Sequence, residues 1–358
     1  MIQTPLNQIH KNLGAKMLEY AGFEMPIQYS GVNQEHKAVR ENLGVFDVSH
    51  MGQFRFFGDN SIELLQKLTS NDVSKLKKHQ AQYTCLINEN GGIIDDLILY
   101  KIEEEDYLMV VNAGCLDKDW EWVNRHNDLG VNIENQSDDI AVLAIQGPKA
   151  IEAMQSLTHV DLNGIKFYHI EIGEFAGVQD VIISATGYTG SGGFEIYFSS
   201  QDSEKIWNAV MEAGKDFGIE PCGLASRDTL RLEKGYCLYG NEINEETTPL
   251  EAGLGWITKL GKDFIGADIL RKQKEDGVEK KIMAFKMIEK GIPRQGYPIV
   301  DQDGNDIGFV TSGTQSPMLK EGIGMGYVKT NLANIDQEIY IQIRNKNVKA
   351  KIVKTPFV

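Results

Sequence analysis

Three short apolar runs between residues 81 and 113 constrain the fold more than any other feature of the sequence. They read AQYTCLIN, GGIIDDLILY and DYLMVVNAG, and each has the length and the Ile, Leu, Val and Tyr content of a strand. Asn90-Gly91 separates the first two runs, and glycine there tolerates the positive φ of a hairpin turn. The pattern predicts an antiparallel meander of three strands.

The second run carries two adjacent carboxylates inside an apolar strand. Because successive side chains point to opposite faces, Asp96 shares a face with Tyr100, and Asp95 lies on the other face. A buried carboxylate must be paired, hydrogen-bonded or neutralised. Two interpretations follow from the residues alone: both acids are structural, or one of them faces a cleft and has a function.

Composition excludes several classes of function. A net charge of −15 and a pI near 5.0 argue against a broad nucleic-acid or anionic membrane surface. The four cysteines form no Cys-x-x-Cys pair and no Cys/His cluster, so we expect reduced thiols and no metal. The N-terminus lacks the basic and apolar regions of a signal peptide, and no apolar run approaches the ~18 residues of a membrane span. We therefore expect a bacterial cytoplasmic protein.

Helical and strand-rich segments alternate irregularly, which predicts an α+β fold. Most of the first 44 residues are expected to be helical, at NLGAKMLEY and again at VNQEHKAVRENLG, whose Gly44 fits a helix end. Further helices are expected at 61–68, 116–126, 147–157, 203–215 and 223–234. After the charge-rich stretch 271–281, short strands with glycine turns predict a small C-terminal β-barrel or Greek key.

Three motifs are rejected as functional signals. Gly322-x-Gly324-x-Gly326 lacks the spacing of a dinucleotide fingerprint and is interpreted as a turn. Gly261-Lys262 is followed by Asp263, where a P-loop requires Ser or Thr. Ser49-His50 lies outside any nucleophile elbow, and we interpret both as ordinary strand residues.

Two further segments have both a structural and a functional interpretation. In ATGYTGSGGFEIYF (185–198) a glycine-rich loop enters a strand with Glu195 and Tyr197 on one face, so it is either a simple hairpin or a loop that a flat ligand approaches. Arg227 and Arg231 lie one turn apart on a helix that ends at Gly235. They either bind a carboxylate ligand or pair with Asp228 or Glu233.

Together these segments resemble the T protein of the glycine cleavage system, the folate-dependent aminomethyltransferase family. They occur in family order across nearly the whole chain, and the set is specific although each motif alone is weak. The matching segments are FDVSHMG (46–52), GGIIDDLILY (91–100), VVNAG (110–114), GYTGSGGFE (187–195), SRDTLRLEKGYCLYGNEINEETTPLEAGLGW (226–256), GFVTSGTQSP (308–317) and GIGMGYV (322–328).

The resemblance implies an α+β, three-domain cloverleaf around a central folate cavity. Domain 1 would comprise residues 1–50 with 141–245, domain 2 residues 51–140 with the meander, and domain 3 the C-terminal β-barrel at 246–358. It also implies the reaction. An aminomethyl group on the lipoyl arm of the H protein is split to give ammonia, 5,10-methylenetetrahydrofolate and dihydrolipoyl H protein. Tetrahydrofolate is the co-substrate, and the P and L proteins are functional partners.

The resemblance also assigns site residues by position. Asp96 matches the catalytic aspartate, whereas Asp95 is expected to be structural. Glu195 matches a residue at the pterin, whose amino group and ring N–H form a donor pair suited to one carboxylate. The other positions expected to bind folate or line its cavity are Tyr83, Tyr100, Tyr168, Tyr188, Met51, Asn112, Arg227 and Trp256. The chain ends at TPFV, whereas some relatives extend further and place an aromatic residue near the folate.

Two rival functions share this fold. A folate-dependent demethylase would take its one-carbon unit from a sulfonium or an amine, and such relatives often sit on larger flavoprotein chains. A folate-binding factor for iron–sulfur assembly would carry Lys-Gly-Cys-Tyr-x-Gly-Gln-Glu, whereas this chain has KGYCLYGNE at 234–242. The sequence therefore favours aminomethyl transfer over both.

Overall fold

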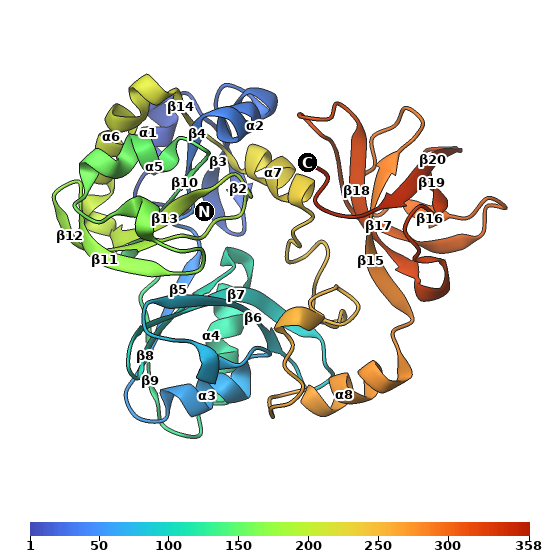
Figure 1. The fold of residues 1–358 in the computed structure, drawn as a ribbon, viewed down its shortest axis with the longest axis horizontal. Helices are drawn as coiled ribbons and strands as arrows, with labels where there is room; N and C mark the ends of the chain where they lie inside the picture. The colour runs from blue at the N-terminus through green and yellow to red at the C-terminus, as the bar shows by residue number, and fades with distance from the viewer. The chain divides into compact units, whose positions relative to one another are not determined.

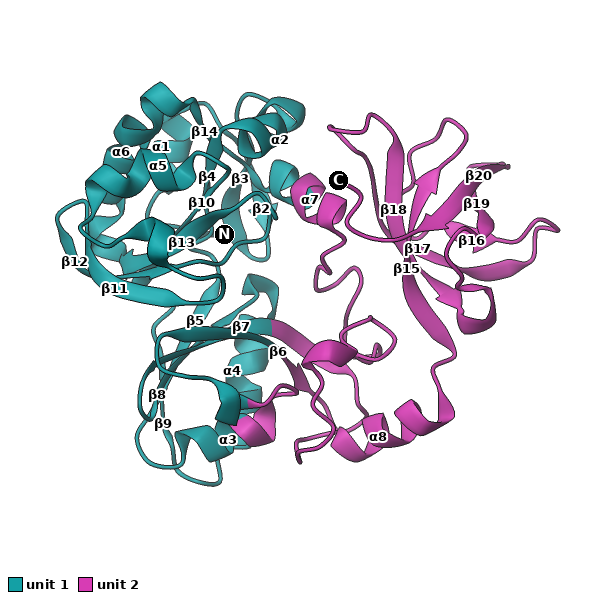
Figure 2. Ribbon diagram, viewed as in Figure 1, with its two compact units in different colours: residues 1–65, 73–83, 97–228 teal, residues 66–72, 84–96, 229–358 magenta.

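The computed structural model describes residues 1–358 and divides into two compact units (Figures 1 and 2). Unit 1 comprises residues 1–65, 73–83 and 97–228, and unit 2 comprises 66–72, 84–96 and 229–358. The chain passes between them after residues 65, 72, 83, 96 and 228, so two of the crossings fall within strands β6 (Gln80–Ile87) and β7 (Ile93–Glu103). Each unit is described by itself below.

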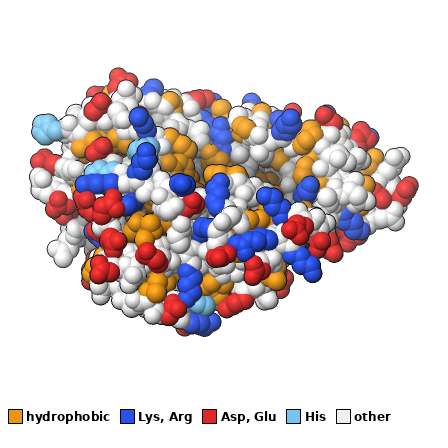
Figure 3. All heavy atoms as spheres, turned by 60° about the horizontal axis from the view of Figure 1, so that its bottom comes forward, with side chains coloured by type: hydrophobic (Ala, Val, Ile, Leu, Met, Phe, Trp, Pro, Cys, Tyr) orange, Lys and Arg blue, Asp and Glu red, His pale blue; other side chains and the backbone are white.

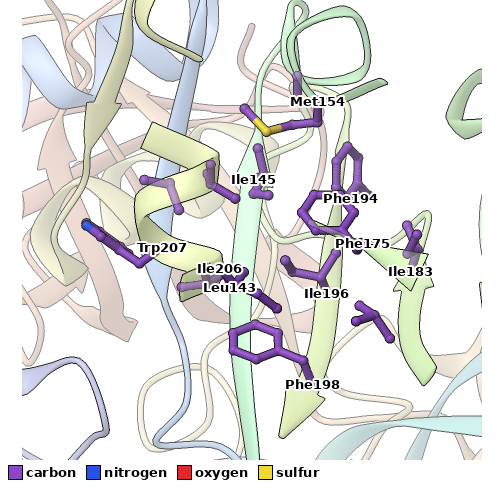
Figure 4. Packing of buried hydrophobic residues seen from close by; sticks show 14 of the residues in the cluster. Leu143, Ile145, Met154, Phe175, Ile183, Phe194, Ile196, Phe198, Ile206 and Trp207 are labelled. Atoms are coloured by element: carbon purple, nitrogen blue, oxygen red, sulfur yellow. The ribbon is translucent and has the colours of Figure 1, made fainter. Parts of the chain in front are cut away.

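Unit 1 contains a six-stranded sheet in the order β11-β12-β13-β10-β4-β14. Strand β10 pairs antiparallel with both β13 and β4, and β14 is parallel to β4. The bounds are β4 (Leu43–Asp47), β10 (Ile140–Gln146), β11 (Ile170–Phe175), β12 (Val178–Ser184), β13 (Gly193–Ser199) and β14 (Ile219–Pro221). Period-two alternation sends Phe194, Ile196 and Phe198 into one apolar core with Trp207 (Figure 4). The opposite face of β13 therefore carries Glu195 and its neighbour Tyr197.

A second sheet has the order β6-β7-β8-β5-β9, with β5 (Gly52–Phe57), β8 (Asp106–Val111) and β9 (Asn132–Asn135). The predicted three-strand meander is confirmed as β6, β7 and β8. Gly91 has φ +83°, and Asn88 N–H bonds Gly92 O at 2.9 Å across the turn. The glycine is thus required by the hairpin.

The helices follow the predicted segments except near the N-terminus. They are α1 (Asn7–Asn12), α2 (Val32–Glu41), α3 (Ser61–Leu68), α4 (Leu116–Arg125), α5 (Ala150–Met154), α6 (Ser203–Gly214), α7 (Leu224–Lys234) and α8 (Ala267–Asp276). Helix α8 includes the first part of the charge-rich stretch 271–281, which we expected to be a separator. As expected, Gly235 ends α7 with φ +73°.

The helix predicted at residues 12–20 is wrong. Its second half is β2 (Lys16–Tyr20), which pairs antiparallel with β3 (Phe23–Gln28) in a three-stranded sheet completed by β1 (Ile2–Gln3). Ala21 and Gly22 both have positive φ, 51° and 85°, as a two-residue type I′ hairpin turn requires. Gly44 is likewise no helix end but part of β4, where a Cβ would lie 2.5 Å from Cys222 Sγ.

Unit 2 contains the predicted C-terminal β-barrel, closed in the order β15-β18-β17-β16-β19-β20. Its strands are β15 (Lys280–Met287), β16 (Pro298–Val300), β17 (Asp306–Gln315), β18 (Gly322–Lys329), β19 (Glu338–Ile343) and β20 (Lys346–Val353). The turn predicted at Gly322-x-Gly324-x-Gly326 is wrong, because β18 contains all three. A Cβ at Gly326 would meet Phe309 O at 2.5 Å, so glycine here allows close approach of strands.

No helix is long and apolar enough to cross a membrane. Acidic and basic side chains are interspersed over the face of the molecule in Figure 3.

Candidate functional site

The two carboxylates of β7 differ in exposure. Asp95 is fully buried, as are its same-face neighbours Leu97 and Leu99, whereas Asp96 and Ile98 are partly exposed. We expected both faces of this strand to be covered, and the structure leaves two residues of the Asp96 face partly exposed. Only the Asp96 face leaves a carboxylate open to a ligand, which fits the different roles expected for the two acids.

The segment after α7 holds the start of β7 in place within unit 2. The N–H of Ile93 donates to the carbonyl oxygens of Asn244 (3.1 Å) and Thr247 (3.0 Å), and the Tyr239 hydroxyl donates to Ile93 O (3.2 Å). A Cβ at Gly92 would lie 1.8 Å from Glu245 O, so only glycine permits this approach. The motif YGNEINEETT therefore positions the strand that carries both acids.

Buried thiols lie near this carboxylate pair. Burial raises the pKa of the Cys85 thiol well above its usual value, and the charges of Asp96 and Asp95 raise it further. Burial, with the charges of Glu242 and Asp96, likewise raises the pKa of Cys237, against a smaller opposing effect of Arg231. Both thiols are therefore protonated and poorly nucleophilic at neutral pH. All four cysteines of the chain are free and buried, and no group of three or more His, Cys, Asp or Glu side chains is arranged to hold a metal ion.

A second set of polar groups surrounds Glu195 in unit 1. Thr186 Oγ1 donates to Glu195 Oε2 at 2.6 Å, and Ser184 Oγ lies 2.8 Å from Thr186 Oγ1. The Tyr100 hydroxyl lies 3.3 Å from Thr186 Oγ1 and 3.0 Å from the Tyr197 hydroxyl. The structure thus brings together two residues expected at the folate, Glu195 and Tyr100.

Sequence reasoning missed Ser184, Thr186 and Tyr197. A signal for them exists, because Ser184 ends β12 with Thr186 two residues later, and Tyr197 follows Glu195 by two on β13. Residues two apart on a strand share a face. Their polarity on a covered face could have identified them.

The two tyrosines of this cluster are neutral hydroxyl groups. Burial and the charge of Glu195 raise the pKa of Tyr100 to about 12, against an opposing effect of its hydroxyl hydrogen bonds. Burial, Tyr100 and Glu195 raise the pKa of Tyr197, which the charge of Arg227 lowers in part. At neutral pH both phenols can donate a hydrogen bond, and neither serves as a base.

Side-chain hydrogen bonds of Arg40 and Gln146 hold the glycine-rich loop before β13 in place. Arg40 NH1 donates to Thr189 O (2.5 Å) and to Ser191 Oγ (2.7 Å), and Thr189 Oγ1 donates to Gln146 Oε1 (2.8 Å). Within this loop Tyr188 lies beneath Arg227, with the guanidinium carbon 5.0 Å from the ring centroid. Two more of the residues expected at the folate are therefore in contact.

Arg227 also influences His50, which the structure places in a turn and not in the strand we expected. The turn forms because Asp47 Oδ1 accepts the N–H of Ser49 at 2.9 Å. Burial, opposed by the charge of Asp47 and reinforced by that of Arg227, lowers the pKa of His50 to about 4. Arg227 NH1 and His50 Nδ1 are buried without hydrogen-bond partners. Met51, which follows His50, is partly exposed.

For the other residues expected at the folate, the structure gives backbone contacts or the degree of exposure. Tyr168 has the unusual φ of +60°; its N–H donates to Ala185 O, next to Thr186, and its carbonyl accepts the N–H of Ala81. Strand β6 therefore runs past Tyr168. Tyr83 on β6 and Asn112 after β8 are partly exposed in unit 1. Trp256, in unit 2, is 62% exposed.

Comparisons with known proteins cover the whole chain. The GCVT N-terminal domain model matches residues 6–262, and the glycine cleavage T-protein C-terminal barrel domain model matches 280–358. An aminomethyltransferase of Flavobacterium psychrophilum is 60% identical over 357 residues, covering 100% of this chain and 99% of that protein. One of Phocaeicola vulgatus is 55% identical over 359 residues, with coverage of 100% and 99%.

Solved structures agree with the sequence relatives. The crystal structure of glycine cleavage system aminomethyltransferase T from Bartonella henselae has a TM-score of 0.93 and 32% sequence identity, covering 99% of this chain and 98% of that one. The resemblance seen in the sequence and the α+β fold with a C-terminal barrel are both confirmed. The chain belongs to the glycine cleavage T-protein family of aminomethyltransferases.

Proposed function

We propose that this chain transfers the methylene group of S-aminomethyl-dihydrolipoyl H protein to tetrahydrofolate. The carbon–sulfur and carbon–nitrogen bonds of the aminomethyl group break, and two bonds to folate nitrogens form. The products are ammonia, 5,10-methylenetetrahydrofolate and dihydrolipoyl H protein. The observation that carries the proposal is the 60% identity, over its full length, to a bacterial aminomethyltransferase.

In this proposal Asp96 is the catalytic residue. As the thiolate leaves, the methylene carbon develops cationic iminium character, and a fixed carboxylate nearby stabilises that charge and orients the attacking amine. Partial exposure of Asp96 on a mostly buried strand supports this role, because a ligand can reach it. Full burial of Asp95 supports a structural role for that acid.

In the same proposal, Glu195 binds the pterin ring of tetrahydrofolate. Its carboxylate would accept the amino and ring N–H donors, while aromatic rings pack on the flat faces of the cofactor. The cluster of Tyr100 with Glu195 and the stack of Arg227 on Tyr188 support a ligand site in unit 1. The other proposed folate-cavity positions are Tyr83, Tyr168, Met51, Asn112 and Trp256.

A division into three domains also remains a proposal, and the strand content of the chain supports it. The strands of the six-stranded sheet lie at 43–47 and between 140 and 221. These ranges agree closely with the proposed bounds of domain 1, residues 1–50 and 141–245. Those of the five-stranded sheet fall within 51–140, and the barrel strands fall within 246–358. We further propose that the protein works in the bacterial cytoplasm with the H, P and L proteins, as its bacterial relatives suggest.

The test is turnover of aminomethylated lipoyl H protein with tetrahydrofolate, measuring ammonia and methylenetetrahydrofolate together. Asp96→Asn should lower kcat by about 10²–10³ while tetrahydrofolate still binds, because it removes an electrostatic stabiliser. Asp95→Asn is the matched control on the same strand, and we expect it to lower the melting temperature while the folded enzyme keeps turning over. Tight folate binding without turnover by the unmodified protein would contradict the proposal and favour the demethylase or the assembly factor.

A further inference from the structure

Four buried hydroxyl groups form a connected cluster beside Glu195. Tyr100 comes from β7, Ser184 from the end of β12, Thr186 from the residues just after it, and Tyr197 from β13. All four are at least nine-tenths buried, and Glu195 itself is 8% exposed. We call these four residues the hydroxyl cluster.

The hydrogen bond between Thr186 and Glu195 has a definite direction. A carboxylate only accepts hydrogen bonds, so the single hydroxyl hydrogen of Thr186 points at Glu195 Oε2, 2.6 Å away. Having used that hydrogen, Thr186 can only accept from its neighbours. Ser184 Oγ lies 2.8 Å from Thr186 Oγ1 and donates to the Tyr100 hydroxyl at 3.3 Å. The hydroxyl that contacts Glu195 is therefore linked to other buried hydroxyl groups, and hydrogen bonds connected in this way strengthen one another.

The backbone of Thr186 is also held in place. Gln146 is 2% exposed, and its Nε2 donates to Thr186 O at 3.3 Å and to Phe194 O at 3.2 Å. This amide therefore links the two ends of the glycine-rich loop. Thr186 lies at one end of the loop, and Glu195 follows the other end. The Thr186 hydroxyl is thus fixed relative to the strand that carries Glu195.

We propose that Thr186 is a positioning residue for substrate recognition, acting through Glu195; this inference rests on the proposed function. A pterin offers two parallel N–H donors, which a carboxylate meets only when its plane is coplanar with the ring. The terminal torsion of a Glu side chain is broad, so the carboxylate alone does not hold that plane. The hydrogen bond from Thr186 to Oε2 fixes it before the ligand arrives, which lowers the entropic cost of binding.

The test is a double-mutant cycle on tetrahydrofolate affinity, measured by equilibrium dialysis with the full-length protein. Thr186→Val should raise Kd about tenfold, which is the size expected for losing one hydrogen bond to a charged group. Thr186→Ser keeps the hydroxyl and should stay within about threefold. Combined with Glu195→Ala, Thr186→Val should change Kd by less than about twofold, because no carboxylate is left to position.

Thr158→Val is the matched control, since Thr158 Oγ1 also donates at 2.6 Å, to Glu174 O, in unit 1. It should lower the melting temperature without changing folate affinity. Should Thr186→Val fail to fold, Ser184→Ala replaces it in the cycle, with an expected two- to threefold loss that disappears without Glu195.

The outcomes separate this inference from the function on which it rests. No tetrahydrofolate binding by the unmodified protein overturns the proposed function itself. Binding that Glu195→Ala weakens and Thr186→Val leaves unchanged overturns only the role of Thr186. Equal losses for Thr186→Val with and without Glu195 also overturn it, because they would show that Thr186 acts by another route.

Discussion

Acidification from pH 7 to pH 5 should destabilise this protein through one residue, His50. Its imidazole is fully buried, and burial, reinforced by the charge of Arg227 and opposed by Asp47, lowers its pKa from the ordinary 6.5 to about 4. Between these two values the unfolded chain binds a proton that the folded chain does not. Stability therefore falls as the pH falls through this window.

The magnitude follows from the size of the shift. A difference of about 2.5 pKa units corresponds to about 3.4 kcal/mol over the whole window, at about 1.36 kcal/mol per unit. Because the window extends from 6.5 to about 4, the part lost between pH 7 and pH 5 is about 2 kcal/mol. This is a large share of the 5–15 kcal/mol that holds a typical domain folded.

Urea denaturation at pH 7, 6 and 5 measures this loss directly. His50→Asn cannot titrate here, so its unfolding free energy should fall by about 2 kcal/mol less than that of the unmodified protein over the same range. His159→Asn, at an exposed position, is the control and should keep the full pH dependence. The same slope in His50→Asn as in the unmodified protein would refute the reasoning, whatever the absolute stability of the variant.

Two further predictions concern unit 2. Arg231 and Glu242 form a buried ion pair at 2.8 Å, so Arg231→Met should cost about 3–5 kcal/mol in urea denaturation, and adding Glu242→Leu should restore part of it. A small loss for the single variant would show that Glu242 finds other partners. Gly308→Ala would place a Cβ 1.8 Å from Tyr327 O in the barrel and should cost about 3 kcal/mol, whereas Gly261→Ala, with open space around it, should stay within about 0.5 kcal/mol. Equal melting temperatures for these two glycine variants would contradict the strand spacing.

Local sequence predicted the fold where burial leaves a pattern. Strand β7 and the barrel were recognised because apolar residues alternate there between glycine turns. The hairpin of β2 was missed because it buries little: Leu18 is 47% exposed and Tyr20 38% exposed. A strand without a buried face carries no alternation, and its apolar residues can equally fit a helical spacing. The hairpin turn depends on positive φ values at Ala21 and Gly22, and an Ala-Gly pair is a weak sequence signal for such a turn.

The candidate site was predictable only in part, for a related reason. Glu195 and Asp96 stand out because each is a carboxylate within an apolar strand, and local spacing shows that. The partners of Tyr100 in the hydroxyl cluster are 84 to 97 residues away, so no local pattern records which hydroxyl meets which.

What the sequence does record is a shared property. Ser184, Glu195 and Tyr197 are all polar residues at positions where a strand should be covered. Burying such groups unpaired costs free energy, so each must have found a partner elsewhere in the fold. Polar residues on covered strand faces therefore belong together, and searching for them as a set is a better guide to a site than any one motif.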